Sequence, residues 1–424
     1  MLIEFRVANH RSIRDEQAFT MQADDVDPAD PRPRHVSGFG GRLLPAAALY
    51  GANASGKSNV LSALGFMRDA VLESQRAWPP EGGVPRDPFA WGGQSSEPSL
   101  FEVTLLIADV RYRYGFLADD LHFVEEWLYA SNGEEEQSWF VRDDDRFSFG
   151  DQLLGENRLI EQVTRPNALF LSAAVQLRHQ QLGPLYGWFR NLQAVNIEKG
   201  GRVQPADRGS EYRMVLELRD SKDKPLPQRL ASFVELLRAA DVGIMDLKTE
   251  ETDQGSGVFN GGHREIRLRV LLRHRNAAEE TWLPLEQESQ GTRTLYQMGN
   301  ILLDVLGNGG LLLVDELEAH LHPILALQIL RQFNDTSTNS HNAQILFTTH
   351  DTHLLGTILG DAPLRRDQVW LTEKDSEGAT CLYPLTDYKP RPSENLERGY
   401  LQGRYGAIPF LGDLVKYRNP ADGE

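Results

Sequence analysis

The clearest chemistry in the sequence lies between Gly51 and Ser58, where eight residues read GANASGKS. They fit G-x-x-x-x-G-K-[ST], a loop whose backbone N–H groups surround phosphates. In such a loop the glycines let the backbone approach the phosphates, Lys57 reaches the β and γ phosphates, and the Ser58 hydroxyl ligates Mg²⁺. The motif therefore predicts a nucleotide site. Its predicted binding residues are Gly51, Asn53, Ala54, Ser55, Gly56, Lys57, Ser58 and Asn59.

A second set of reactive groups follows two apolar runs in the last third of the chain. Residues 311–314 read LLLV, the uninterrupted apolarity of a central parallel strand, and lead directly into Asp315 and Glu316. Residues 343–349 form another apolar strand, which ends before His350. Carboxylates at the carboxyl end of a strand suit Mg²⁺, so this strand end is a candidate metal site.

The elements around these residues predict how they are positioned. Residues 46–50 are a short apolar run suited to a buried strand, and the apolar residues between Val60 and Val71 recur at helical spacing. A helix over residues 324–333 crosses back between the two later strands. Strands that alternate with helices predict an α/β fold with a doubly wound parallel sheet. Between residues 101 and 142, four alternating segments separated by turns predict an antiparallel β subdomain.

Composition narrows the class of protein. The chain has 424 residues, 40% of them hydrophobic, which is enough for a large core and two or three structural units. A formal charge of −17 disfavours a protein that coats nucleic acid with its whole surface. The single cysteine excludes an intrachain disulfide and fits a reducing cytoplasm. No signal-peptide pattern or long apolar run is present, so we expect a cytoplasmic protein without a membrane span.

Taken in order, these motifs resemble the ATPase core of the ABC class, in the branch shared with structural-maintenance-of-chromosomes (SMC) and RecF proteins. After the phosphate loop comes Gln176, a candidate glutamine loop. Residues 288–292, ESQGT, then open a helix and resemble a divergent ABC signature. The strand ending in Asp315 and Glu316 follows, then residues 318–322 at the dimer-loop position, and then His350 at the switch position. The signature differs from the Ser-Gly-Gly-Gln of transporters, and His322 stands where many members have aspartate.

The resemblance implies ATP and Mg²⁺ as cofactors and a role for each residue. Asp315 would hold Mg²⁺, Glu316 would polarise the attacking water, and His350 would contact the γ-phosphate. Gln176 would report on Mg²⁺ and the nucleophile, as both a metal and a catalytic residue. Arg11 resembles a basic N-terminal position that this class places near the nucleotide.

The same resemblance implies a homodimer, or a higher homo-oligomer. In this class two protomers enclose two ATP molecules, and Ser289 and Gly291 of one chain would reach the nucleotide held by Lys57 of the other. A helix N-terminus suits that contact, because its free N–H groups and its dipole favour an anionic phosphate. A monomer should therefore hydrolyse ATP poorly.

The layout and residues 394–409 are similar to the bacterial AAA-type ATPases of abortive-infection and restriction-linked loci. That resemblance implies a sensor or regulator in anti-phage defence, with a separately encoded effector such as an RloB-like nuclease of Toprim fold or another toxin. The alternatives are a RecF-like repair ATPase that binds DNA as an ATP-closed dimer and a regulatory scaffold that hydrolyses little ATP. A transporter subunit ranks last.

The predicted organisation has four parts. Residues 1–199 form an N-terminal ATPase lobe that contains the antiparallel subdomain at about 97–150. Residues 200–280 form an inserted lobe of helix and strand, and residues 281–390 form the C-terminal ATPase lobe. Residues 391–424 form a tail.

Overall fold

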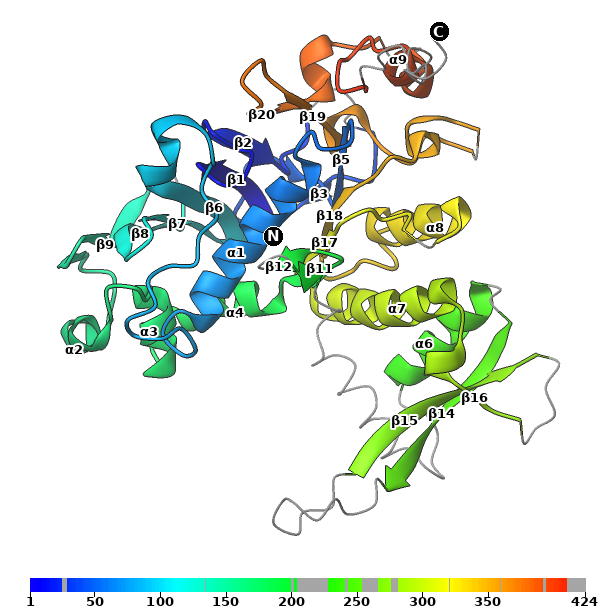
Figure 1. Cartoon of the computed structure of the whole chain (residues 1–424), viewed down its shortest axis with the longest axis horizontal. Helices are drawn as coiled ribbons and strands as arrows, with labels where there is room; N and C mark the ends of the chain where they lie inside the picture. The colour runs from blue at the N-terminus through cyan, green and yellow to red at the C-terminus, as the bar shows by residue number, and fades with distance from the viewer. Residues whose placement is uncertain are drawn as a thin grey trace, which may run out of the picture.

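A six-stranded sheet carries the phosphate loop at the end of one of its inner strands (Figure 1). Its order is β11 (Gln193–Val195), β17 (Leu311–Val314), β18 (Gln344–Thr348), β5 (Ala46–Gly51), β19 (Val369–Lys374) and β20 (Thr380–Pro384). The first five strands are parallel, and β20 pairs antiparallel with β19. The computed structural model describes residues 1–24, 29–133, 135–199, 202–203, 228–240, 243–253, 266–275, 281–319, 321–358, 360–391 and 394–409.

Side chains of β5, β17 and β18 alternate between two hydrophobic cores, one on each face of this sheet. The first core receives Ala47, Leu49, Leu311, Leu313 and Leu346. The second receives Ala46, Ala48, Tyr50, Leu312, Val314, Ile345 and Phe347. Burial on both faces explains why these strands are unbroken apolar runs, and it agrees with the prediction of buried parallel strands.

A seven-stranded antiparallel sheet closes the first core. Its order is β10 (Arg146–Phe149), β9 (Gln137–Asp143), β8 (Phe123–Ser131), β7 (Val110–Ala118), β6 (Ser99–Ile107), β1 (Leu2–Ala8) and β2 (Gln17–Thr20). Helix α1 (Lys57–Glu73) lies between the two sheets and buries its apolar residues in this core (Figure 1). The sheet extends beyond the predicted 97–150 segment, because β1 pairs with β6 across about a hundred residues.

Three short helices, α2 (Asn157–Val163), α3 (Phe170–Gln176) and α4 (Gly183–Asn191), follow the antiparallel strands. The fully buried carboxylate of Glu126 on β8 accepts hydrogen bonds from the backbone N–H groups of Phe170 (2.6 Å) and Leu171 (3.1 Å). Burial raises the pKa of this carboxyl group. The Ser172 hydroxyl accepts from the N–H of Gln75, just past the last turn of α1, over 3.2 Å. These contacts fix α3 beside the carboxyl end of α1.

Helices α7 (Gln290–Asn308) and α8 (Pro323–Asn334) cover the second face of the parallel sheet. Beyond α7 project α6 (Gln228–Ala239) and the small sheet of β14 (Ile244–Asp253), β15 (Ile266–His274) and β16 (Leu283–Pro284) (Figure 1). These are the described parts of the predicted inserted lobe, and β16 extends it past residue 280. Much of 200–280 and residues 410–424 of the predicted tail lie outside the described residues.

Smaller elements complete the fold. They are two strand pairs, β3 (Arg34–His35) with β4 (Arg42–Leu43) and β12 (Glu198–Lys199) with β13 (Arg202–Val203), the C-terminal helix α9 (Leu396–Leu401), and the 3₁₀ helices η1 (Gly92–Ser96), η2 (Leu285–Gln287), η3 (Thr352–Leu355), η4 (Arg366–Gln368) and η5 (Leu385–Tyr388). Within the described part of the chain, no helix is long and apolar enough to span a membrane.

Candidate nucleotide site

The phosphate loop joins the end of β5 to the start of α1, in the order that the motif predicted. Gly56 directly precedes α1 with a φ of 108°, a backbone conformation that favours glycine. A Cβ atom on Gly56 would collide with the side chain of Thr380, and one on Gly51 with Thr372 and Ser55. Asn53 and Ala54 form the exposed tip of the loop, where Ala54 has a φ of 61°. Both glycines are therefore required by close packing as well as by the turn.

Two threonines, one on β19 and one on β20, contact this loop through hydrogen bonds. The hydroxyl groups of Ser55 and Thr372 on β19 lie 2.6 Å apart. The Thr380 hydroxyl on β20 donates to the Ser55 carbonyl oxygen over 2.9 Å. Both threonines are buried. Neither threonine was predicted as a site residue, because a threonine in a strand carries no local sign that it will face a phosphate loop.

Lys57 is the cation of the site. Its side chain is buried in the loop, and its ammonium group donates to the carbonyl oxygens of Gly51 (2.9 Å) and Ala52 (3.0 Å). Burial lowers the pKa of Lys57, although the charges of Asp315, Glu316 and Glu318 act in the opposite direction. The ammonium group thus faces acceptors of the same loop that it would exchange for phosphate oxygens.

Ser58 and Asp315 come together from the two halves of the chain. The Ser58 hydroxyl donates to Asp315 Oδ1 over 2.9 Å. The same carboxylate oxygen accepts a hydrogen bond of 2.6 Å from the Thr348 hydroxyl at the end of β18. A hydroxyl and a carboxylate at the mouth of a phosphate loop are the hard oxygen ligands that Mg²⁺ prefers, so these residues fit a magnesium–nucleotide complex.

Glu316 and His350 lie at the carboxyl ends of the adjacent strands β17 and β18. Glu316 is exposed and has a φ of 54°, unusual for a residue other than glycine. The His350 side chain is exposed, and its backbone N–H donates to Glu318 Oε1 over 2.6 Å. Partial desolvation of the ring, and then the positive charge of Lys57, lower the pKa of His350. His350 therefore belongs to the same electrostatic neighbourhood as Lys57.

The turn that contains Arg11 is tied to the same site. The amide group of Asn59 donates to the Ser12 hydroxyl over 2.6 Å, and that hydroxyl lies 2.7 Å from the hydroxyl of Thr380. Arg11 itself pairs with Asp87 at 3.2 Å. The turn thus lies against the first turn of α1, while the Arg11 guanidinium group is engaged by a carboxylate.

The structure does not bring Gln176 together with these residues. Gln176 is the exposed last residue of α3, which is held beside the carboxyl end of α1, whereas Lys57 begins α1. The 17 residues of α1 span about 25 Å. Gln176 therefore lies away from the phosphate loop, and the prediction that it belongs to the nucleotide site is not supported.

Ser289 and Gly291 lie on the opposite face of the parallel sheet from α1. Ser289 directly precedes α7, and its hydroxyl accepts from the backbone N–H of Thr292 over 3.1 Å. The Ser289 side chain is exposed. Helix α7 packs in the second core and α1 in the first, so the two helix N-termini are separated by the sheet within one chain. His320, in the segment expected to form the dimer loop, lies outside the described residues.

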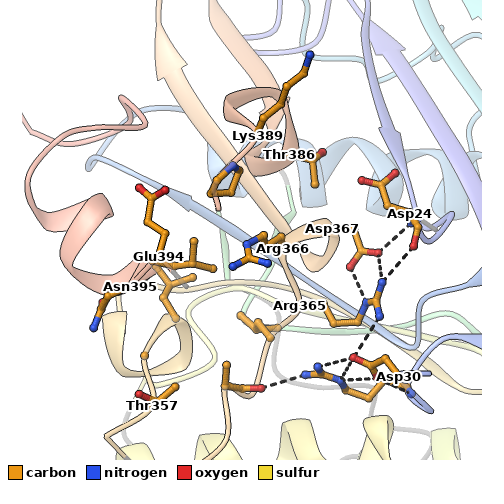
Figure 2. Close-up of a pocket in the computed structure, with 17 residues that line it drawn as sticks. Asp24, Asp30, Thr357, Arg365, Arg366, Asp367, Thr386, Lys389, Glu394 and Asn395 are labelled. Atoms are coloured by element: carbon orange, nitrogen blue, oxygen red, sulfur yellow. Dashed lines mark hydrogen bonds and ion pairs between the residues drawn. The ribbon is translucent and has the colours of Figure 1, made fainter. Parts of the chain in front are cut away.

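A cavity of about 810 Å³ lies elsewhere, between η3, η4, η5 and the start of α9. Figure 2 shows the Arg365 guanidinium group between Asp30 and Asp367, with ion-pair distances of 3.1 and 2.8 Å. Burial alone would raise the pKa of Asp30, but hydrogen bonds from Arg32 and the nearby charges lower it to about 2. The cavity contains none of the residues predicted to bind nucleotide, so we assign these ion pairs a structural role.

The phosphate loop at the end of β5, the parallel strand order and the antiparallel β subdomain define an α/β P-loop fold with a mixed insertion lobe, in agreement with the AAA domain of the matching family model. The chain belongs to the family described as "AAA domain, putative AbiEii toxin, Type IV TA system", whose model matches residues 46–356.

Comparison with other proteins adds little to this assignment. No curated protein matches the chain. Among solved structures, the SMC head domain from Thermotoga maritima is similar, with 12% identity and a TM-score of 0.40 over 90% of this chain and 98% of that one. An Smc head domain with an extended coiled coil, bound to the C-terminal domain of ScpA derived from Pyrococcus furiosus, is also 12% identical, with a TM-score of 0.42 over 95% and 98%. With TM-scores below 0.5, these structures support no conclusion about the chain.

Proposed function

We propose that the chain binds ATP with Mg²⁺ and hydrolyses it to ADP and phosphate. The observation that carries the proposal is the 2.9 Å hydrogen bond between Ser58 and Asp315, beside the buried Lys57. It supports the proposal because Lys57 would contact the phosphates while the adjacent Ser58 hydroxyl and Asp315 carboxylate would bind magnesium. Phosphoryl transfer depends mainly on positioning and charge neutralisation, which these groups are suited to provide.

Each residue has a distinct part in the proposed reaction. Lys57 would exchange the carbonyl oxygens of Gly51 and Ala52 for oxygens of the β and γ phosphates. Ser58 and Asp315 would hold Mg²⁺, which when bound neutralises phosphate charge. Glu316, which is exposed at the end of β17, would orient and polarise the attacking water. His350 would donate to the γ-phosphate from the end of β18.

We further propose that the active species is a homodimer. Lys57 and Ser289 lie at the N-termini of helices on opposite faces of the sheet. Within one chain, the signature residues therefore do not reach the phosphate site. Ser289 is exposed at the start of a 19-residue helix, where free N–H groups favour an anion. A second chain would supply Ser289 and Gly291 to the nucleotide held by Lys57.

The biological role that we propose is regulation of an anti-phage defence system in the cytoplasm. The family description, with its reference to a type IV toxin system, supports a place in toxin-based defence. ATP binding and hydrolysis would restrain or release a separately encoded effector, either an RloB-like nuclease or another toxin. Phage-challenged cells that carry the intact locus should lose protection when the chain carries Lys57→Ala. Full protection by that variant would exclude nucleotide-dependent regulation.

The enzymatic proposal is tested with Glu316→Gln. Removing the carboxylate should abolish turnover while ATP binding continues, so the variant should accumulate as an ATP-bound dimer. Phosphate release and light scattering after gel filtration, each with MgATP and with MgADP, measure the two effects. Glu161→Gln, on α2 and outside the site, is the matched control and should behave as wild type. An unchanged rate in Glu316→Gln would overturn the catalytic assignment.

A further inference from the structure

The side chain of Thr348 joins the two acidic residues of the candidate site. Its hydroxyl donates to Asp315 Oδ1 over 2.6 Å and accepts from the backbone N–H of Glu316 over 2.7 Å. The Thr348 carbonyl oxygen also accepts from the N–H of Leu317 over 3.0 Å. One residue at the end of β18 thus holds three consecutive residues after β17.

The surroundings of Thr348 hold its hydroxyl group in one position. The residue is 0% exposed and pairs with Leu49 of β5, the strand that leads into the phosphate loop. A threonine hydroxyl has one proton to donate, and that proton is directed to Asp315. The position of the Asp315 carboxylate is therefore set jointly by Thr348 and by Ser58, which donates to the same oxygen.

The hydrogen bond to Glu316 acts on a strained backbone. Glu316 has a φ of 54°, in the left-handed region that non-glycine residues rarely occupy without a compensating contact. Accepting the N–H of Glu316 stabilises this conformation, which in turn determines where the Glu316 carboxylate points. The sequence gives no sign of this role, because Thr348 reads as the polar end of an apolar strand.

We propose that Thr348 is a positioning residue for hydrolysis: its hydroxyl orients Asp315 toward the metal and Glu316 toward the attacking water. The inference rests on the proposed ATPase function. Thr348 would act through these two neighbours and would not itself touch the nucleotide. Its removal should therefore affect turnover and the magnesium requirement much more than ATP affinity.

Thr348→Val and Thr348→Ser separate the hydroxyl from the shape of the side chain. Valine fills nearly the same space without a donor or acceptor, whereas serine keeps the hydroxyl. Loss of one hydrogen bond to a carboxylate and one from a backbone N–H predicts that Thr348→Val lowers the single-turnover rate about 10- to 100-fold. The Mg²⁺ concentration for half-maximal rate should rise several-fold, and the ATP dissociation constant measured in EDTA should stay within about threefold. Thr348→Ser should recover most of the wild-type rate.

The outcomes distinguish this inference from the ATPase proposal. If wild type hydrolyses ATP and Glu316→Gln does not, a Thr348→Val rate within twofold of wild type overturns the positioning role. Equal losses in Thr348→Val and Thr348→Ser also overturn it, because the hydroxyl would then be irrelevant. If wild type shows no hydrolysis, the proposed function itself fails. Should the valine variant not fold, Thr348→Cys, with its weak thiol donor, takes its place with the same expected loss.

Discussion

The hydroxyl of Ser58 donates a hydrogen bond of 2.9 Å to Asp315 Oδ1, across 257 positions of the sequence. The two residues follow different strands, Ser58 after β5 and Asp315 after β17, and β18 lies between those strands. The parallel sheet brings them together because parallel strands place their carboxyl ends at one edge. This pairing joins the phosphate loop to the carboxylate that is expected to bind the metal.

Replacing Ser58 with alanine should weaken ATP binding only when magnesium is present. The variant removes one oxygen ligand but leaves the phosphate loop and Lys57 in place, so we expect about a tenfold loss of affinity for MgATP. Affinity for ATP in EDTA should be nearly unchanged. Calorimetric titrations in Mg²⁺ and in EDTA measure both values, and Ser58→Thr, which keeps a hydroxyl, is the control. A loss of equal size in EDTA would assign Ser58 to the phosphates instead.

Replacing Lys57 with alanine should weaken ATP binding whether or not magnesium is present. The ammonium group is the cation buried in the loop, and its charge-assisted contacts to phosphates should contribute roughly 2–4 kcal/mol. The same titrations measure this loss. Lys389→Ala is the matched control, because Lys389 is an exposed lysine beside the separate cavity shown in Figure 2. Tight ATP binding by Lys57→Ala would contradict the assignment of the phosphate site.

Two glycine-to-alanine substitutions on either side of the start of α1 should change stability in opposite directions. Gly56 has a φ of 108°, and a Cβ there would lie under 3.0 Å from three side-chain atoms of Thr380. Gly56→Ala should therefore lower the free energy of unfolding by about 1–3 kcal/mol. At Gly65, inside α1, the nearest atom to an added Cβ is Ile197 Cγ2 at 3.9 Å. Gly65→Ala should raise stability by about 0.5–1 kcal/mol.

Urea denaturation of the two variants and of wild type provides the measurement. Both substitutions add one methyl group, so the comparison isolates backbone conformation and packing space. Gly56→Ala should also lose ATP affinity, because the shifted loop can no longer surround the phosphates. A Gly56→Ala variant as stable as wild type would show that the loop tolerates a Cβ at residue 56.

The elements that the sequence predicted best are those set by local pattern. The strand predicted at 311–314 is β17, and the strand and helix around the phosphate loop are β5 and α1. The helix predicted at 324–333 is α8, one residue longer at each end. In these segments the apolar spacing of adjacent residues determines the structure, because each segment is buried on one or both faces.

Contacts between distant segments were not predictable in the same way. Thr348, Thr372 and Thr380 contact the site only because β18, β19 and β20 share a sheet with β5 and β17. Gln176 is the opposite case: its place in the order of motifs matched the family, but it does not contact the site. The buried Glu126 nevertheless holds the start of its helix, at the other end of α1 from Lys57. The order of motifs along the chain therefore does not by itself predict which residues lie close together. The pairing of the strands must be known as well.

The buried His10 should make stability depend on pH between about 6.5 and about 3, the pKa values of the unfolded and folded chains. Its Nε2 lies 2.9 Å from the Ser62 hydroxyl on α1, and burial, followed by the charge of Arg11, lowers the pKa of His10 from 6.5 to about 3. The unfolded chain therefore takes up a proton near pH 6.5 that the folded chain does not, so this contribution to stability is complete above pH 6.5 and is lost as pH falls.

Between pH 7.5 and 5.5 the loss attributable to His10 is about 1.4 kcal/mol. In His10→Gln, which has no titrating group at this position, the unfolding free energy should fall by that much less than in wild type over the same interval. Urea denaturation at both pH values measures the two differences, and other groups cancel in the comparison. Gln at this position will change absolute stability, but only the pH dependence decides the outcome. Parallel pH profiles for the two proteins would mean that the folded chain takes up the same proton as the unfolded chain, so that burial does not lower the pKa of His10.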